Sequence, residues 1–246
     1  MSKVNSIRKG CKDVFNAFLV AMATYAGFFE FPVIYPCYDI PNRLIPFSKC
    51  ISAKDHNCWV HFYEDDYLFE RLWRNPKIYL PILQRYNGVI LPDWSLYRDM
   101  PLVMQLWNIY RSRAIGVWLQ VNGVKVIPNL RYGDKRTFKV CSDGLPRHSV
   151  IAVGTHGTLK ILEDRDIFVK GLEVVVRRIV PIAIIVYGAC PDCIFQKYRD
   201  MGIMIIHFES DFGKMMSSSE EVAKSSSRPR SRRRPSTISP PRRTSG

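Results

Sequence analysis

The stretch WVHFYEDDYLFERLWRNPKIYLPILQRYNGVIL, residues 59–91, decides the fold because it contains one complete strand-helix-strand unit. Residues 59–63 form a β-rich run, and the acids at 64–66 suit the amino terminus of a helix. Apolar residues then recur at helical spacing, with a break at Asn75-Pro76. Asn87-Gly88 ends the helical pattern, and a second apolar strand follows directly.

The same alternation continues toward the carboxyl terminus. Pro101 suits the start of a further helix, which Asn122-Gly123 ends. Residues 164–179 carry acids at one end and arginines at the other, as the helix dipole prefers. A last helix is expected to begin at Pro191-Asp192 and to stop just before Gly202. The strands are expected to start near residues 59, 88, 124, 149, 183 and 203.

These spacings predict an α/β fold with a largely parallel sheet built from repeated βα units. The strand runs are continuously apolar, which is typical of strands covered on both faces. Two further candidate strands, residues 31–35 and 43–47, would bring the number to eight. We therefore favour a partial or complete (β/α)-barrel-like arrangement over an open, doubly wound sheet.

The amino-terminal stretch from Val14 to Phe29 is uncharged and follows several basic residues. This layout resembles a secretory signal, but Asp13 interrupts the basic lead and polar residues interrupt the stretch, so a buried element or a cap on the core is favoured. No run reaches the roughly 18 apolar residues of a membrane span. The chain has an odd number of scattered cysteines, which suits a reducing compartment: Cys11, Cys37, Cys50, Cys58, Cys141, Cys190 and Cys193. We expect a cytoplasmic protein with no membrane partner.

The 246 residues carry 36 Lys and Arg against 22 Asp and Glu, and much of the excess lies at the carboxyl terminus. Residues 217–246 contain ten serines, four prolines and no aromatic residue, so we expect a disordered basic tail after a single α/β domain at 1–216. The tail could bind DNA or RNA phosphates, or simply keep the protein soluble. Its arginines are the candidate nucleic-acid-binding residues: Arg228, Arg230, Arg232, Arg233, Arg234, Arg242 and Arg243. The oligomeric state is left open.

Polar residues follow the expected strands at their carboxyl ends, where parallel α/β proteins bind ligands. The candidate catalytic rim consists of Asp93, Asn129, Arg131, Asp134, His156 and Glu209. Such a set could hold a divalent metal ion or divide acid and base roles. The alternative for each carboxylate taken alone is a helix cap or a turn. His61 is expected to be a hydrogen-bonded strand histidine.

Cys190-Pro191-Asp192-Cys193 follows one expected strand and opens a helix. This geometry could lower a thiol pKa, but the pair lies late in the chain for a thioredoxin-like domain. No second CxxC or close histidine pair completes a zinc site, so packing cysteines are favoured over redox or metal roles. The chain has no GxGxxG, P-loop, GxSxG or HExxH motif, which argues against the common chemistries that use them.

Several strings resemble an uncharacterised family known only as a domain of unknown function and encoded by bacterial phages, plasmids and integrated mobile elements. They occur in one order along the chain: 59–63 with 69–71, 95–101, 125–129, 154–157 and 208–210. The similarity covers most of residues 11–213. The resemblance implies a mobile-element context, but it transfers no catalytic residue.

Two classes of function follow. The first is a phage or mobile-element accessory protein that associates with nucleic acid through the tail and through the α/β body. The alternative is an enzyme, a metal-assisted hydrolase or phosphoryl-transfer enzyme, with its site at the carboxyl ends of the strands. A pure interaction protein is a third and weaker option. The sequence leaves open whether the protein is an enzyme.

Overall fold

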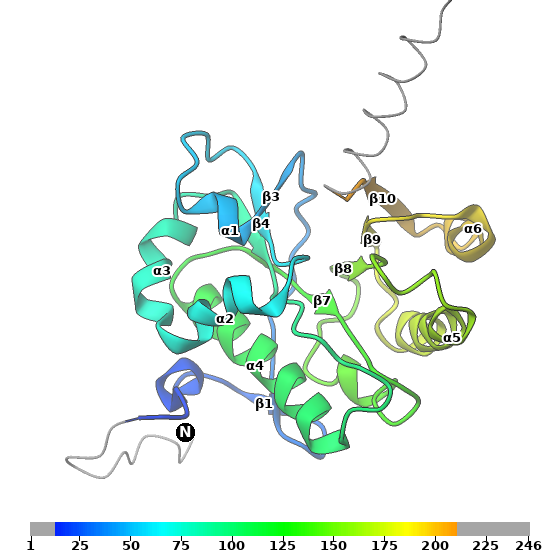
Figure 1. The fold of residues 1–246 in the computed structure, drawn as a ribbon, viewed down its shortest axis with the longest axis horizontal. Helices are drawn as coiled ribbons and strands as arrows, with labels where there is room; N and C mark the ends of the chain where they lie inside the picture. Colours follow the sequence, from blue (N-terminus) through cyan, green and yellow to red (C-terminus); the bar gives the residue numbers. More distant parts are fainter. Residues whose placement is uncertain (1–12, 211–246) are drawn as a thin grey trace, which may run out of the picture. The chain divides into compact units, whose positions relative to one another are not determined.

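The computed structural model describes residues 13–210, and its centre is a set of parallel strands (Figure 1). These strands run β3 (Leu44–Pro46), β4 (Trp59–His61), β5 (Gly88–Ile90), β6 (Val126–Ile127), β7 (Asn129–Leu130), β8 (Val150–Gly154), β9 (Ala183–Tyr187) and β10 (Met204–Phe208). The strands predicted near 59, 88, 124, 149, 183 and 203 are all present, and residues 44–46 confirm the candidate strand at 43–47.

The strands form two four-stranded parallel sheets, ordered β3-β4-β5-β6 and β7-β8-β9-β10. The proline at position 128 separates β6 from β7, so a single chain segment ends the first sheet and begins the second. Spatial order follows chain order without reversal, as in (β/α) barrels and unlike doubly wound folds. The predicted parallel α/β class is confirmed. Within the described residues the barrel is not closed, because β3 and β6 are the edge strands of one sheet and β7 and β10 are those of the other.

Helices connect the strands, with α2 to α4 beside the first sheet and α5 and α6 beside the second (Figure 1). Their bounds are α1 (Phe47–Cys50), α2 (Asp66–Arg74), α3 (Pro76–Leu83), α4 (Leu102–Val121), α5 (Leu162–Ile179) and α6 (Asp192–Asp200). The break predicted at Asn75-Pro76 separates α2 from α3. Pro101 is the N-cap of α4 rather than its first residue. Within residues 13–210, every helix is too short or too polar to serve as a membrane span.

The amino-terminal residues confirm the interpretation as a cap on the core. The 3₁₀-helix η2 (Ala17–Val20) buries Leu19 and Val20 almost completely. The expected strand at 31–35 is corrected, because β2 (Phe31–Pro32) pairs antiparallel with β1 (Tyr25–Ala26) outside the parallel sheets. The proline at 32 has no backbone N–H and cannot donate a hydrogen bond to a neighbouring strand. Two residues later, the backbone N–H of Ile34 donates to the carbonyl of Gly144. A second 3₁₀-helix, η3 (Val140–Ser142), follows β7.

The core has an outer and an inner part. The outer part lies between the strands and the helices and includes Phe62, Leu72 and Val186. The inner part is a second cluster, made of Cys37 from the segment before β3 and of strand side chains from both sheets: Trp59, Ile90, Ile127, Val150, Ala152, Ala183 and Ile185. Alternate strand residues point to opposite faces, and both faces are buried along the inner strands β4, β5, β8 and β9, whereas the edge strands β3 and β10 are partly exposed. This filled interior leaves the carboxyl ends of the strands as the place for a ligand.

Candidate functional site

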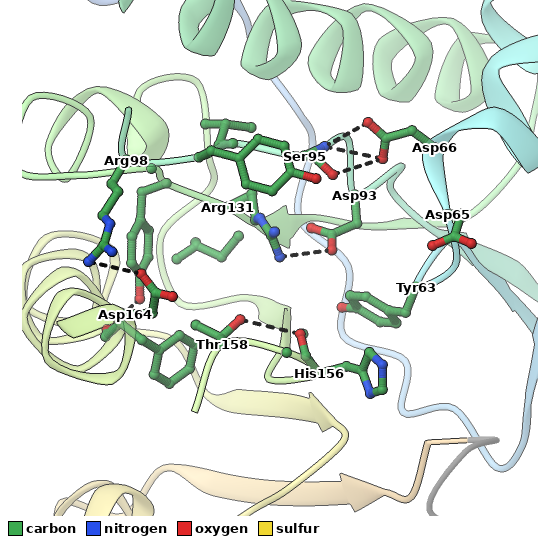
Figure 2. A pocket seen from close by; sticks show the side chains of 18 of the residues that line it. Tyr63, Asp65, Asp66, Asp93, Ser95, Arg98, Arg131, His156, Thr158 and Asp164 are labelled. Carbon is green, nitrogen blue, oxygen red and sulfur yellow. Dashed lines mark hydrogen bonds and ion pairs between the residues drawn. The ribbon is translucent and has the colours of Figure 1, made fainter. Parts of the chain in front are cut away.

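A cavity of about 800 Å³ lies at the carboxyl ends of the strands. Its walls come from the segments that follow β4, β5, β7 and β8 and from the first turns of α5 (Figure 2). Cavities of roughly 300–1,000 Å³ are typical of small-molecule sites, and this position is the one expected for a parallel α/β protein.

Four side chains form a hydrogen-bonded chain at this cavity, and three of them, Tyr63, Asp93 and Arg131, line its wall. The Tyr63 hydroxyl donates to Asn129 Oδ1 at 2.9 Å, and Asn129 Nδ2 donates to Asp93 Oδ1 at 2.6 Å. Arg131 Nη1 lies 3.2 Å from the other carboxylate oxygen, Oδ2 of Asp93. Both carboxylate oxygens of Asp93 are therefore held in place, and only 10% of its side-chain surface is exposed.

Burial sets the proton affinity of these groups. Loss of solvation raises the pKa of Asp93, and Asp66 adds to the effect, while Arg131 and Asn129 oppose it. Burial also raises the pKa of Tyr63 well above its ordinary value, so its hydroxyl stays protonated and remains a donor. The result is a carboxyl group that takes up a proton more readily than an exposed aspartate does, which is the property of an acid–base catalyst.

Gly154, the last residue of β8, leaves the space that Tyr63 occupies. A Cβ atom at this position would lie 2.8 Å from Cδ1 of Tyr63 and 3.5 Å from Oδ2 of Asp93. The Tyr63 ring instead stacks on Tyr187 with ring centroids 4.7 Å apart. Glycine at this strand end thus lets the second sheet approach the side chains of the first.

The segment that carries Asp93 is anchored on both sides. Ser112 Oγ on α4 donates to the carbonyl of Pro92 at 3.0 Å. On the other side, Trp94 Nε1 donates to Glu70 on α2 at 3.0 Å, and the same carboxylate accepts from Arg111 at 2.8 and 2.9 Å. These contacts fix the backbone on each side of Asp93.

Four of the six predicted rim residues lie together. Asp93, Asn129 and Arg131 are linked directly, and His156 lines the same cavity. Asn129 is a strand residue in β7 rather than the loop residue that its place after an apolar run indicated.

The other two predicted rim residues have different surroundings. Asp134 pairs with Arg136 at 2.6 Å, accepts from Gln105, and also accepts from the backbone N–H of Arg136 two residues further on. This is the turn role that the alternative interpretation described, and these contacts hold the pKa of Asp134 well below its usual range. Glu209 is exposed and is not part of the cavity wall.

A divalent metal ion was one of two options for the rim residues, and the part of the chain that the structure describes offers no ligand set for it. Within residues 13–210, no three His, Cys, Asp or Glu side chains gather so that they could hold a metal ion. His61 is a buried strand residue whose Nδ1 accepts from the backbone N–H of Tyr63 at 3.1 Å, which confirms the expected structural role.

The cavity also contains residues that the sequence did not single out. Asp66 accepts hydrogen bonds from the N–H and the hydroxyl of Ser95, which ties α2 to the segment after β5. Arg98 pairs with Glu163 and lies 3.6 Å from Asp164, which ties that segment to α5 (Figure 2). Tyr63 could have been found from strand periodicity, since it shares the inward-facing side of its strand with Trp59.

Cys190 and Cys193 lie outside the cavity wall, at the start of α6. Both are free thiols, and Arg165 Nη2 lies 3.1 Å from the sulfur of Cys193. Burial raises the pKa of Cys190, which works against a reactive thiolate at that position. The redox and packing interpretations of this pair stay predictions.

The comparisons with known proteins agree with the resemblance in the sequence. Residues 23–209 match the family described as Domain of unknown function (DUF4417). The chain is 32% identical over 192 residues to the "Gene 1 protein" of Mycobacterium phage L5, a match that covers 76% of this chain and 82% of the phage protein. The "Gene 1 protein" of Mycobacterium phage D29 is also 32% identical over 192 residues, which is 70% of its length. No solved structure matches. The chain therefore belongs to this family of unknown function, whose relatives include two mycobacteriophage proteins.

Proposed function

We propose that the described domain is a hydrolase whose acid–base group is Asp93. The observation that carries this proposal is the state of the Asp93 carboxyl, which is buried beside an open cavity, hydrogen-bonded to Asn129 and paired with Arg131. Its raised pKa lets it exchange a proton with a substrate or a water molecule at a pH closer to neutral. Arg131 would hold the ionised form in place after proton transfer.

The charge of the cavity favours hydrolysis of an uncharged or cationic substrate over phosphoryl transfer. Six acidic residues line it, against two arginines: Glu64, Asp65, Asp66, Asp93, Asp99 and Asp164, with Arg98 and Arg131. A phosphate group would add negative charge to a site that already has an acidic excess. The same excess argues against the cavity as a nucleic-acid interface. The proposal involves no metal, because residues 13–210 contain no ligand set and because Arg131 already neutralises Asp93.

A screen of chromogenic nitrophenyl and nitroanilide substrates tests this proposal with the full chain. It covers glycosides, amides, carboxylic esters and phosphate esters. We expect turnover of an uncharged or cationic class, and we expect Asp93→Asn to lower kcat by about 100-fold or more. Asp134→Asn is the matched control and should leave kcat unchanged, because Asp134 lies outside the cavity wall. Turnover of phosphate esters alone, or equal rates for Asp93→Asn and the unchanged protein, would contradict the proposal.

A second function, polyanion binding by the carboxyl-terminal tail, is supported by composition. Residues 222–246 hold eight basic residues and no acidic residue, and seven of the eight are arginines. Guanidinium groups pair with phosphates in a bidentate manner, so DNA or RNA is the partner that this segment suits. The tail lies outside the described residues. The two mycobacteriophage relatives support a phage or mobile-element setting, and the free thiols of the described cysteines are compatible with the cytoplasm of the host cell.

Replacing the seven tail arginines by glutamine in the full chain tests this second function. DNA and RNA binding is measured over a series of salt concentrations for both proteins. We expect both the affinity and its salt dependence to fall in the variant. The slope of log K against the logarithm of the salt concentration should become shallower by roughly 0.9 for each DNA phosphate that the tail no longer neutralises. Unchanged binding and an unchanged slope would assign any nucleic-acid affinity to another part of the chain and would contradict a role for the tail.

A further inference from the structure

We infer that the cavity at the carboxyl ends of the strands binds an organic cation with more than one positive group. This inference rests on the proposed function of the same cavity and adds the class of its ligand. Spacing between the positive groups is part of the inference, because the acidic side chains are spread along the walls.

The acidic excess of the cavity stands out against the charge of the whole chain. The protein has a net charge of +14, yet the cavity wall contains three times as many carboxylates as arginines. Both arginines are already paired, Arg131 with Asp93 and Arg98 with Glu163 and Asp164. The negative charge that remains is therefore not neutralised by cations of the wall itself.

The cavity carboxylates that are not paired with an arginine differ in the hydrogen bonds that they accept. Glu64 accepts hydrogen bonds from the N–H and the hydroxyl of Ser48 at 2.8 and 2.5 Å, and Asp66 accepts from Ser95. In contrast, the side chains of Asp65 and Asp99 make no hydrogen bond or ion pair to any residue in the described range 13–210. Asp65 occupies the N-cap position of α2, but its side chain does not cap the helix. These two carboxylates are available to a ligand.

The distribution of the acids separates an organic cation from a metal ion. Asp65 and Asp66 lie on one side of the cavity and Asp164 lies on the other (Figure 2). A metal ion needs its ligands to converge on one point, and within the described residues no three such side chains do so. Carboxylates placed apart on the walls instead match ammonium or guanidinium groups that are separated along one molecule.

Apolar and aromatic side chains line the same cavity. Leu68, Leu96 and Phe168 line the cavity, as do two exposed tyrosines, Tyr67 and Tyr97. Tyrosine faces attract organic cations, and aliphatic side chains suit the methylene segments that join the positive groups. The volume of about 800 Å³ accommodates a chain of this kind.

Calorimetric titration of the full chain with spermidine, at constant ionic strength, tests the inference. The matched uncharged probe is 1,8-octanediol, which has a similar length and a hydroxyl group at each end. The test variant is the double substitution Asp65→Asn and Asp99→Asn, and the control is Asp166→Asn, which removes an exposed carboxylate on α5 outside the cavity wall.

We expect spermidine to bind at least about tenfold more tightly than the diol, and we expect the double variant to weaken spermidine by about tenfold, since each exposed carboxylate contributes a factor of roughly three. The control should bind spermidine like the unchanged protein. Equal affinity for the two probes, or equal affinity of the double variant and the unchanged protein for spermidine, would overturn the inference. These outcomes are independent of the hydrolysis screen, in which only the acid–base role of Asp93 is at stake.

Discussion

Asn129 Nδ2 donates a 2.6 Å hydrogen bond to Oδ1 of Asp93, and this bond joins the two parallel sheets at the candidate site. Asp93 follows β5 in the first sheet, whereas Asn129 opens β7 in the second. The proline at 128 lies between β6 and β7, so the site is built where the chain passes from one sheet to the other. A change in how the sheets meet would therefore alter the surroundings of the Asp93 carboxyl.

Asp93→Asn is expected to retain or increase stability near neutral pH, although it lowers kcat in the hydrolysis screen. The folded-state pKa of Asp93 is raised, so its contribution to stability is present at low pH and is lost as the pH rises through the folded-state pKa. A neutral asparagine keeps the shape and avoids the cost of a buried charge. Urea denaturation over a pH series measures this, and a large loss of stability at pH 7 would show that the Asp93–Arg131 ion pair is mainly structural.

Asp134→Asn should show the opposite pH dependence. Hydrogen bonds from Arg136 and Gln105 lower the pKa of Asp134, so its contribution is present above the ordinary carboxyl pKa and is lost on acidification. Because Arg136 is substantially exposed, we expect a loss of only about 1 kcal/mol near neutral pH and no loss in acid. The same urea series detects it, and a loss relative to the unchanged protein that is larger in acid than at neutral pH would contradict the expectation.

Gly154→Ala should disturb the site through the Tyr63 ring. The added methyl group would lie 2.8 Å from Cδ1 of Tyr63, and the resulting overpacking should cost about 1–3 kcal/mol of unfolding free energy. Gly88→Ala is the matched control, since its methyl group would lie 2.3 Å from Cζ3 of Trp59, a residue outside the cavity wall. Both variants should lose stability in thermal denaturation, but only Gly154→Ala should change the titration of Asp93. An equal effect of both variants on that titration would argue against a local contact.

Glu70→Ala should be the most destabilising of these changes. It leaves Arg111, which is 9% exposed, without its carboxylate partner and removes the acceptor of the Trp94 indole. We expect a loss of about 3 kcal/mol, because an unpaired cation remains largely buried. Glu173→Ala, which breaks the exposed pair with Arg177, should cost only about 0.5 kcal/mol in the same denaturation experiment. Losses of similar size would show that burial of Arg111 is unimportant.

The sequence predicted the fold class and the end of the sheet where the cavity lies. Strand and helix positions could be predicted because apolar runs and their stop signals are local, as at Asn75-Pro76 and Asn122-Gly123. Strand β7 was missed because two residues after a proline give no periodic signal. The candidate strand at 31–35 was placed in the wrong sheet, since an apolar run does not specify its partner.

The site was predicted in part for a similar reason. Asp93, Asn129 and Arg131 were found because each follows a buried apolar run. Asp134 also follows an apolar run, but in the structure its carboxylate is paired with Arg136. The sequence shows that Arg136 is two residues away, but it does not show that the two side chains are hydrogen-bonded. Contacts between distant segments, such as Tyr63 with Asn129, depend on how the two sheets meet and have no local signature.

The most direct test of the account is the proton affinity of Asp93, measured by carbon-13 NMR of the aspartate carboxyl groups in the full chain over a pH titration. Asp93→Asn and Asp134→Asn provide the assignments. The account predicts that Asp93 titrates above the ordinary aspartate value of 3.8, while Asp134 titrates below it. If Asp93 instead titrates at or below 3.8, Arg131 holds it permanently ionised as a structural partner, and the acid–base role proposed for this cavity is wrong.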